Sequence, residues 1–307
     1  MTDASAPYVP TDQEVLDGRY KGDEIPSGTL PGAKKALGLA AVLFLLLMAL
    51  AAFKNRDPER TTEDFFLRKL HQPAIYDAVL IGDSRVVQGI DPTAMGGKAF
   101  NFGFEGLGLT PDVIHAAAKL LRPDGPKILA VAFSAPALSQ DSQASNGFTE
   151  VFHLNPVQQF NLKTFGPAER YLTSKRTAYA YRTRRNDLGF AGVETDRDLT
   201  GEREKAYDKP GYPMYDPKIL QTTLGELEKL SKEGVQVVGF RVPTSQKMYF
   251  LERDLSKVPT DLPAQLAEIG GRWIPGPQRK FVSRDGSHLT YAEAQDYSRW
   301  LGEKLGL

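Results

Sequence analysis

Three residues in two distant segments of the chain could together perform nucleophilic catalysis. Ser84 follows Gly82-Asp83 at the end of an apolar run, and a serine hydroxyl becomes a strong nucleophile only when a nearby base takes its proton. Asp285 precedes His288 by three residues, so one turn could place the carboxylate on one ring nitrogen and leave the other free to face a serine. We predict Ser84 as the nucleophile, His288 as the base and Asp285 as the group that orients the base.

The neighbourhood of Ser84 indicates how a reaction intermediate would be stabilised. The backbone amides of Ser84 and of a glycine in the loop 105–109 could donate hydrogen bonds to a developing oxyanion, an effect of roughly 3–4 kcal/mol per donor. Arg85 could bind an anionic acceptor, although a structural salt bridge explains an arginine here equally well. Asp83 is expected to order the turn rather than to take part in the chemistry.

Short apolar runs predict the strands that position these groups. They cover residues 76–81, 99–104, 127–133 and 236–240. Helical patterns alternate with them, beginning at residue 110 and covering 218–232 and 291–305. This alternation predicts an α/β fold with a mostly parallel sheet covered by helices on both faces. Ligand sites in such sheets lie beyond the carboxyl ends of the strands, and Ser84 falls at one such end.

Residues 134–217 interrupt the alternation with proline, glycine, tyrosine and dense charge. We predict an insertion or cap here, within one domain that spans residues 54–307. The segment 169–185 contains six Lys or Arg against one Glu. We interpret it as a solvated helix face with its tyrosines packed inward. A patch for an anionic polysaccharide or for lipid headgroups is the alternative.

Residues 36–53 form an apolar run of 18 positions without a charge. As a helix this run would be about 27 Å long, close to the thickness of a hydrocarbon core. We predict an uncleaved transmembrane anchor. A cleaved signal peptide is the alternative, but the leader before the run is longer than such peptides allow. Residues 1–35 are predicted to be a flexible polar tail, and the basic residues on both sides of the run leave its orientation open.

Composition narrows the remaining classes of function. Lys plus Arg equals Asp plus Glu at 38 each, so no net charge attracts nucleic acid. The chain contains no cysteine, which excludes disulfides and thiol catalysis, and its four histidines leave little material for a zinc site. We therefore expect neither a metal nor a cofactor, and no nucleic-acid partner.

The order of the motifs resembles the SGNH (GDSL-like) hydrolase family. Three motifs occur in the same order as in that family: a serine at the end of the first strand, a glycine-rich loop after the second strand, and Asp-x-x-His before the last helix. The resemblance covers residues 76–307 and implies a three-layer α/β/α fold. It implies that Ser84, His288 and Asp285 form the catalytic triad, and that Gly106, in the run NFGFEG, is an oxyanion donor.

One block departs from the family's pattern. The family carries a Gly-x-Asn-Asp block after the third strand, whose Asn donates to the oxyanion, whereas here the strand runs into Ser134-Ala135-Pro136. Ser134 could replace that Asn through its hydroxyl, and a merely structural serine is the alternative. The difference argues against an ordinary soluble lipase.

The chain resembles the membrane-anchored branch of the family in three segments that follow the predicted anchor, GDSRVVQGIDP, FNFGFEGLG and DGSHLTYAEAQ. That branch includes the alginate and cellulose acetylation proteins and the D-alanyl transfer protein of teichoic acid synthesis. The resemblance implies transfer or hydrolysis of acyl, above all acetyl, esters of an envelope or exported polysaccharide, beside a multi-spanning membrane-bound O-acyltransferase. It implies a single-pass protein of the inner (cytoplasmic) membrane with a periplasmic catalytic domain. The alternative is a catalytically silent assembly subunit.

Overall fold

The computed structural model describes residues 33–54, 62–106, 108–139, 154–164, 181–207 and 214–307. The chain divides into two compact units, residues 1–53 and residues 54–307. Each unit is described by itself.

The described part of the first unit is helix α2, Ala33–Lys54, which continues one residue into the second unit. It includes the whole apolar run 36–53, and its large apolar side chains from Leu37 to Leu47 are exposed. Within the residues that the structure describes, no helix has both the length and the apolar character needed to cross a membrane. The predicted anchor is therefore not confirmed.

A five-stranded sheet forms the centre of the second unit, with the strand order β2-β1-β3-β6-β7. All of its neighbouring strands are parallel, which confirms the predicted α/β class. Every side chain of β1 and β3 is buried, as expected for central strands covered on both faces. The strands are β1 Ala78–Ile81, β2 Ala99–Asn101, β3 Ile128–Ala132, β6 Gln236–Phe240 and β7 Arg272–Trp273.

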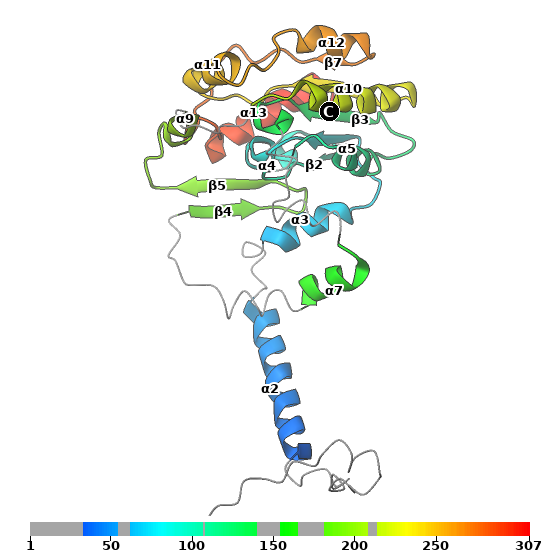
Figure 1. The fold of residues 1–307 in the computed structure, drawn as a ribbon, viewed down its shortest axis with the longest axis vertical. Coiled ribbons are helices and arrows are strands. Elements are labelled where there is room, and N and C mark those ends of the chain that lie inside the picture. Colours follow the sequence, from blue (N-terminus) through cyan, green and yellow to red (C-terminus); the bar gives the residue numbers. More distant parts are fainter. Residues whose placement is uncertain (1–32, 55–61, 107, 140–153, 165–180, 208–213) are drawn as a thin grey trace, which may run out of the picture. The chain divides into compact units, whose positions relative to one another are not determined.

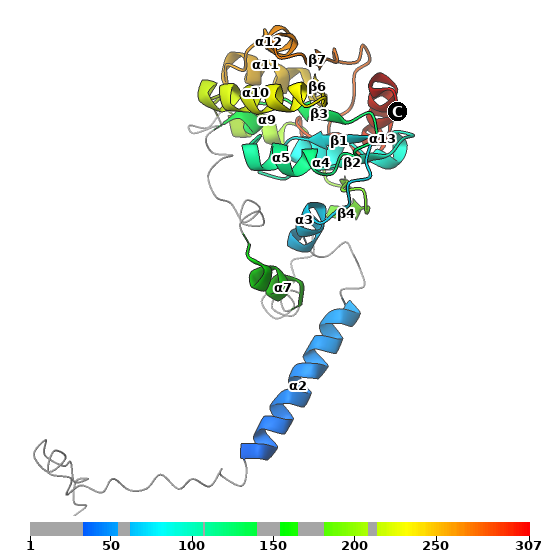
Figure 2. The ribbon, with the colours of Figure 1, turned by 90° about the vertical axis from the view of Figure 1, so that its right-hand side faces the viewer.

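Helices pack on both faces of this sheet (Figures 1 and 2). Helices α5, Pro111–Ala118, and α10, Pro217–Lys232, share one apolar core with the sheet. Helices α4, Ser84–Gly89, and α13, Tyr291–Leu305, share the core on the other face. The second unit also contains helices α3 Thr62–Leu70, α11 Gln246–Asp254 and α12 Leu262–Glu268, with short 3-10 turns η2 Pro92–Ala94 and η3 Pro136–Leu138.

The predicted insertion contains a hairpin of two antiparallel strands, β4 Tyr181–Arg185 and β5 Ala191–Thr195. Figure 1 shows this hairpin beside α3, and the Leu188 carbonyl in its turn accepts the Asn101 amide of β2 at 2.8 Å. Helices α7, Pro156–Thr164, and α9, Glu202–Tyr207, complete its described part. Residues 169–180 of the basic segment lie outside the described residues. Residues 181–185 form strand β4 and not the predicted helix face, because they pair with β5.

Candidate active site

Ser84 is the first residue of α4 and follows the tight turn that leaves β1. Gly82 in this turn has a φ of +155°, and an added Cβ would lie 2.5 Å from a methyl group of Val86, so the turn requires glycine. Asp83 caps the helix, because its Oδ1 accepts the Arg85 amide at 2.9 Å. The turn holds Ser84 half-buried at the carboxyl end of the sheet.

The structure brings the three predicted catalytic residues together, although 204 positions separate Ser84 from His288. The Oγ of Ser84 lies 2.8 Å from Nε2 of His288. The Nδ1 of His288 lies 2.8 Å from Oδ2 of Asp285. The other oxygen of Asp285 accepts the backbone amides of Ser287 and His288, both at 2.8 Å. One turn of chain therefore fixes the acid and the base in a single geometry.

The protonation states of this pair follow from their surroundings. Burial alone would raise the pKa of Asp285, but the hydrogen bond and charge of His288 and the two backbone amides outweigh it and lower that pKa. Burial lowers the pKa of His288, and Asp285 offsets this only in part. An ionised Asp285 can only accept, so Nδ1 of His288 carries the proton and Nε2 is free to accept the Ser84 proton.

Two arginines add positive charge near Asp285. The Nε of Arg284 lies 3.8 Å from its Oδ2, and the Nε of Arg203 lies 4.0 Å from the same oxygen. Both arginines favour an ionised Asp285, and both disfavour a protonated His288. They add to burial, the larger cause, in lowering the pKa of His288 and so favour its neutral, proton-accepting form.

The loop that carries Gly106 is fixed from two sides. Asn101 donates to the Val86 and Ile90 carbonyls at 2.7 Å each and accepts the Gly103 amide at 3.0 Å. Lys69, buried on α3, donates to the Gly103 carbonyl at 2.7 Å. Gly106 itself is exposed, with a φ of +68°. This network ties the predicted oxyanion loop to the helix that begins with Ser84.

Lys69 lies in an aromatic cage. Its Nζ is 4.9 Å from the centre of the Phe65 ring, 5.4 Å from Phe66 and 5.5 Å from Phe104. Burial lowers the pKa of Lys69 well below its ordinary value, while the charge of Glu105 works in the opposite direction. The aromatic rings and the Gly103 carbonyl are the contacts that replace water around this buried amino group.

Ser134 does not face an oxyanion. Its hydroxyl donates to Asp83 Oδ2 at 2.7 Å and accepts the Ala137 amide at 3.2 Å. Of the two interpretations from the sequence, the geometry fits the structural serine, which ties the end of β3 to the turn before α4. Its single hydroxyl proton is already engaged.

Arg85 does not face a substrate either. Its Nη2 donates to Glu252 at 2.6 Å and its Nε to the Ser287 hydroxyl at 2.9 Å, and its side chain is only 5% exposed. Of the two interpretations from the sequence, the geometry fits the structural salt bridge and not the binding of an acceptor. Arg85 links α4, α11 and the loop before His288.

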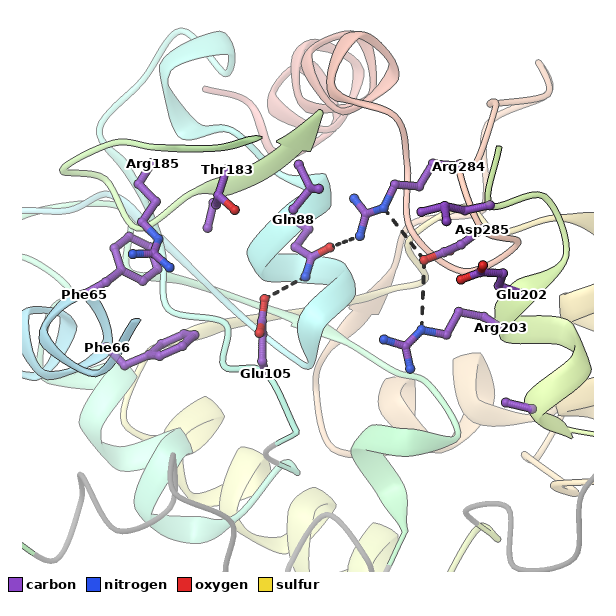
Figure 3. A pocket seen from close by; sticks show the side chains of 14 residues that line it. Phe65, Phe66, Gln88, Glu105, Thr183, Arg185, Glu202, Arg203, Arg284 and Asp285 are labelled. Atoms are coloured by element: carbon purple, nitrogen blue, oxygen red, sulfur yellow. Dashed lines mark hydrogen bonds and ion pairs between the residues drawn. The ribbon is translucent and has the colours of Figure 1, made fainter. Parts of the chain in front are cut away.

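A cavity of about 540 Å³ borders the triad on its acid side (Figure 3). Of the three catalytic residues only Asp285 lines it, but Gln88 lies one turn after Ser84 on α4 and lines it too. Figure 3 shows a chain of polar contacts along its wall, in which Gln88 donates to Glu105 at 2.6 Å and Arg284 donates to Gln88. Residues of α3 and of the β4–β5 hairpin form the opposite wall.

Several residues of this region were not found from the sequence. Gln88, Arg284, Lys69 and Asn101 hold the site, yet each lies in an ordinary helix or loop pattern. Lys69 carries one signal, because it falls on the same helical face as Phe65 and Phe66, where a charge is unexpected. Among the described residues no cluster of His, Asp or Glu side chains could hold a metal ion.

Comparisons with known proteins add little. No family model matches the chain, and neither does any curated protein. A solved structure from Streptococcus pneumonia, provisionally described as a platelet activating factor, is similar to 84% of this chain and to 98% of its own, at 12% identity and a TM-score of 0.39. A likeness of this degree has no functional meaning, so the site is interpreted from its own geometry.

Proposed function

We propose that this protein is a serine esterase or O-acyltransferase of the SGNH type. The hydrogen-bonded series Ser84–His288–Asp285 carries the proposal, because its two 2.8 Å contacts supply a nucleophile, a base and a group that orients the base. The parallel α/β sheet, with Ser84 on the turn after β1 and Asp-x-x-His before α13, supports the SGNH assignment.

In the proposed reaction, Ser84 Oγ attacks the carbonyl carbon of an ester while its proton passes to His288 Nε2. Asp285 stabilises the imidazolium that forms. The amides of Ser84 and Gly106 are the proposed donors to the oxyanion. The intermediate collapses, His288 returns the proton to the departing alcohol oxygen, and an acyl group remains on Ser84. A second hydroxyl then attacks the acyl-Ser84 carbonyl, with its proton passing to His288 and on to Ser84.

The acceptor decides between the two activities. Water makes the protein an esterase, and a sugar hydroxyl makes it a transferase. The proposed substrates are acetyl esters of an envelope polysaccharide, and the proposed partner is a multi-spanning membrane-bound O-acyltransferase. In this proposal the run 36–53 attaches the protein to the inner membrane, with the catalytic domain in the periplasm; the apolar, charge-free sequence of this run supports attachment.

Labelling with a fluorophosphonate probe tests the nucleophile. We expect stoichiometric labelling of the purified chain and its loss in Ser84→Ala, because the probe forms a bond only with an activated serine. Ser231→Ala, a serine in the last turn of α10 at the amino end of the sheet, is the matched control and should label normally. Continued labelling of Ser84→Ala would remove Ser84 from the role.

The same variant separates catalysis from the alternative of a silent assembly subunit. If the protein is catalytic, Ser84→Ala should no longer release acetate from an acetylated oligosaccharide. If the protein is a silent subunit, Ser84→Ala should support modification of the polymer as well as the unchanged protein does. Mass spectrometry of the intact chain after incubation with the oligosaccharide would detect the acyl-enzyme. An acetyl group on Ser84 would add about 42 Da to the mass of the chain, as covalent catalysis requires.

A further inference from the structure

A second cavity opens at the same edge of the sheet as Ser84. Its volume is about 720 Å³, within the range of small-molecule sites. Arg241 and Val242, which directly follow β6, and Ile274, which directly follows β7, line it. Ligands of parallel α/β sheets bind beyond the carboxyl ends of the strands, so its position favours a binding function. No member of the catalytic triad lines it.

The charges that line this cavity are unbalanced. They comprise one carboxylate, Glu252, and five cations, Arg85, Arg241, Arg253, Arg279 and Lys280. The carboxylates that pair with Arg253 and Arg279 come from outside the cavity lining, on Asp254, Glu293 and Asp296. The lining itself thus carries five positive groups and one negative group, and this excess of positive charge favours an anion in the cavity.

A buried ion cluster forms the floor. Arg85 donates to one oxygen of Glu252 at 2.6 Å, and Arg241 donates to the other at 3.3 Å. Tyr207 also donates to the first oxygen at 3.0 Å, and Asp83 offsets the charge of Arg85 from the side of the nucleophile. The Glu252 side chain is 2% exposed, whereas that of Arg241 is 25% exposed. Arg241 is thus the member of the cluster that can still meet a ligand.

The walls combine this charge with apolar surface. Tyr249, Trp273 and Phe281 line the cavity, and the Arg241 guanidinium lies 5.3 Å from the centre of the Tyr249 ring. This contact places the guanidinium over an aromatic face, where the ring helps to hold it in position. Gln246, the first residue of α11, also lines the cavity, so the positive end of a helix borders the same cavity as Arg241.

We infer that this cavity binds a small organic anion with a ring or other apolar body. A carboxylate, sulfonate or phosphate group meets Arg241 and the start of α11, and the apolar body packs on Tyr249 and Trp273. The volume fits a free small molecule rather than a folded partner. The inference is independent of the role of Ser84, because none of its residues takes part in the proposed ester chemistry.

Isothermal titration calorimetry of the full chain with two matched probes tests this site. Naphthalene-1-sulfonate carries both the ring and the charge, and naphthalene-1-sulfonamide has nearly the same shape without the charge. We expect the sulfonate to bind at least tenfold more tightly. Arg241→Gln should weaken sulfonate binding about tenfold and leave the sulfonamide unchanged.

Two further variants keep the test decisive. Lys280→Gln changes an exposed residue that can be replaced without disturbing the fold, and it should weaken sulfonate binding about threefold. Arg203→Gln changes the other cavity, beside Asp285, and should have no effect on the binding of either probe. Equal affinity for the two probes would overturn the inference, as would sulfonate binding that neither Arg241→Gln nor Lys280→Gln changes. Neither outcome bears on labelling of Ser84.

Discussion

His288 must be neutral to accept the serine proton, so its pKa sets the acid limit of activity. Burial lowers that pKa from its ordinary value of 6.5, and the charges of Arg284 and Arg203 lower it further, against the opposing effect of Asp285. The imidazole is then neutral throughout the range from its lowered pKa upward. At the scale of the residue, the surroundings of His288 favour a base that works even in mildly acidic solution.

We predict that kcat/KM for hydrolysis of p-nitrophenyl acetate falls to half its maximum below pH 6.5, the ordinary pKa of histidine. Arg203→Gln removes one positive charge near the ring and should move this midpoint to higher pH. Arg299→Gln, an exposed arginine on α13 that does not border the triad, is the matched control and should not move it. A midpoint above pH 7 in the unchanged protein would contradict the prediction.

The triad could be predicted from the sequence because each half is local. Gly-Asp-Ser after a strand and Asp-x-x-His before a helix are visible within a few positions. The sequence left two interpretations open for Arg85 and for Ser134, because it did not reveal their partners. Glu252 lies 167 positions from Arg85, and Asp83 lies 51 positions from Ser134, so only the folded chain reveals these partners.

At the scale of the elements, Asn101 joins the end of β2 to the nucleophile helix α4. Its side chain makes three hydrogen bonds, to the carbonyls of Val86 and Ile90 and from the amide of Gly103. All three partners are buried backbone groups. The Val86 carbonyl also accepts the Ile90 amide at 3.2 Å, so loss of the side chain falls mainly on the Ile90 carbonyl and the Gly103 amide, which are shielded from water. The position of the Gly106 loop relative to Ser84 therefore depends on this one amide.

We predict that Asn101→Ala lowers the free energy of unfolding by roughly 3 kcal/mol, since each buried backbone group left unsatisfied costs about 1–3 kcal/mol and partial relaxation offsets the sum. We also expect kcat for ester hydrolysis to fall at least tenfold with little change in KM. The substitution would displace the proposed oxyanion donor, the Gly106 amide, which acts in the transition state and not in substrate binding. Urea denaturation and steady-state kinetics measure the two effects.

Asn155→Ala, an exposed cap of α7, is the control for the change from Asn to Ala. It should cost about 1 kcal/mol at most, as typical for a helix cap, and leave kcat unchanged. A stable Asn101→Ala protein with normal kcat would show that the loop does not need this link.

Most of the sheet could be predicted because continuous apolar runs are typical of strands buried on both faces. Strand β7 has two residues and an exposed Arg272, which is too little pattern for recognition. The hairpin of β4 and β5 was missed for another reason. The sequence YRTRR of β4 has no apolar alternation, and this strand is held instead by β5 and by contacts such as Arg184 with Glu194 and with the Tyr291 ring.

At the scale of the whole molecule, the division at residue 53 separates the apolar helix from the unit that contains the site. All residues of the triad, of the oxyanion loop and of both cavities belong to the second unit. Its sheet and two apolar cores are complete without the first unit. Catalysis and attachment should therefore be separable.

We predict that a chain of residues 54–307 keeps the melting temperature and the fluorophosphonate labelling of the full chain but loses the membrane association that we propose for the full chain. In the full chain, Leu45→Lys with Leu46→Lys should release the protein from carbonate-washed membranes, because each charge near the centre of a spanning helix costs about 2.5–3.5 kcal/mol. Leu45→Ala with Leu46→Ala is the matched control and should remain attached. Full-length protein that washes off without any substitution would contradict the proposed anchor and leave the proposed chemistry of Ser84 intact.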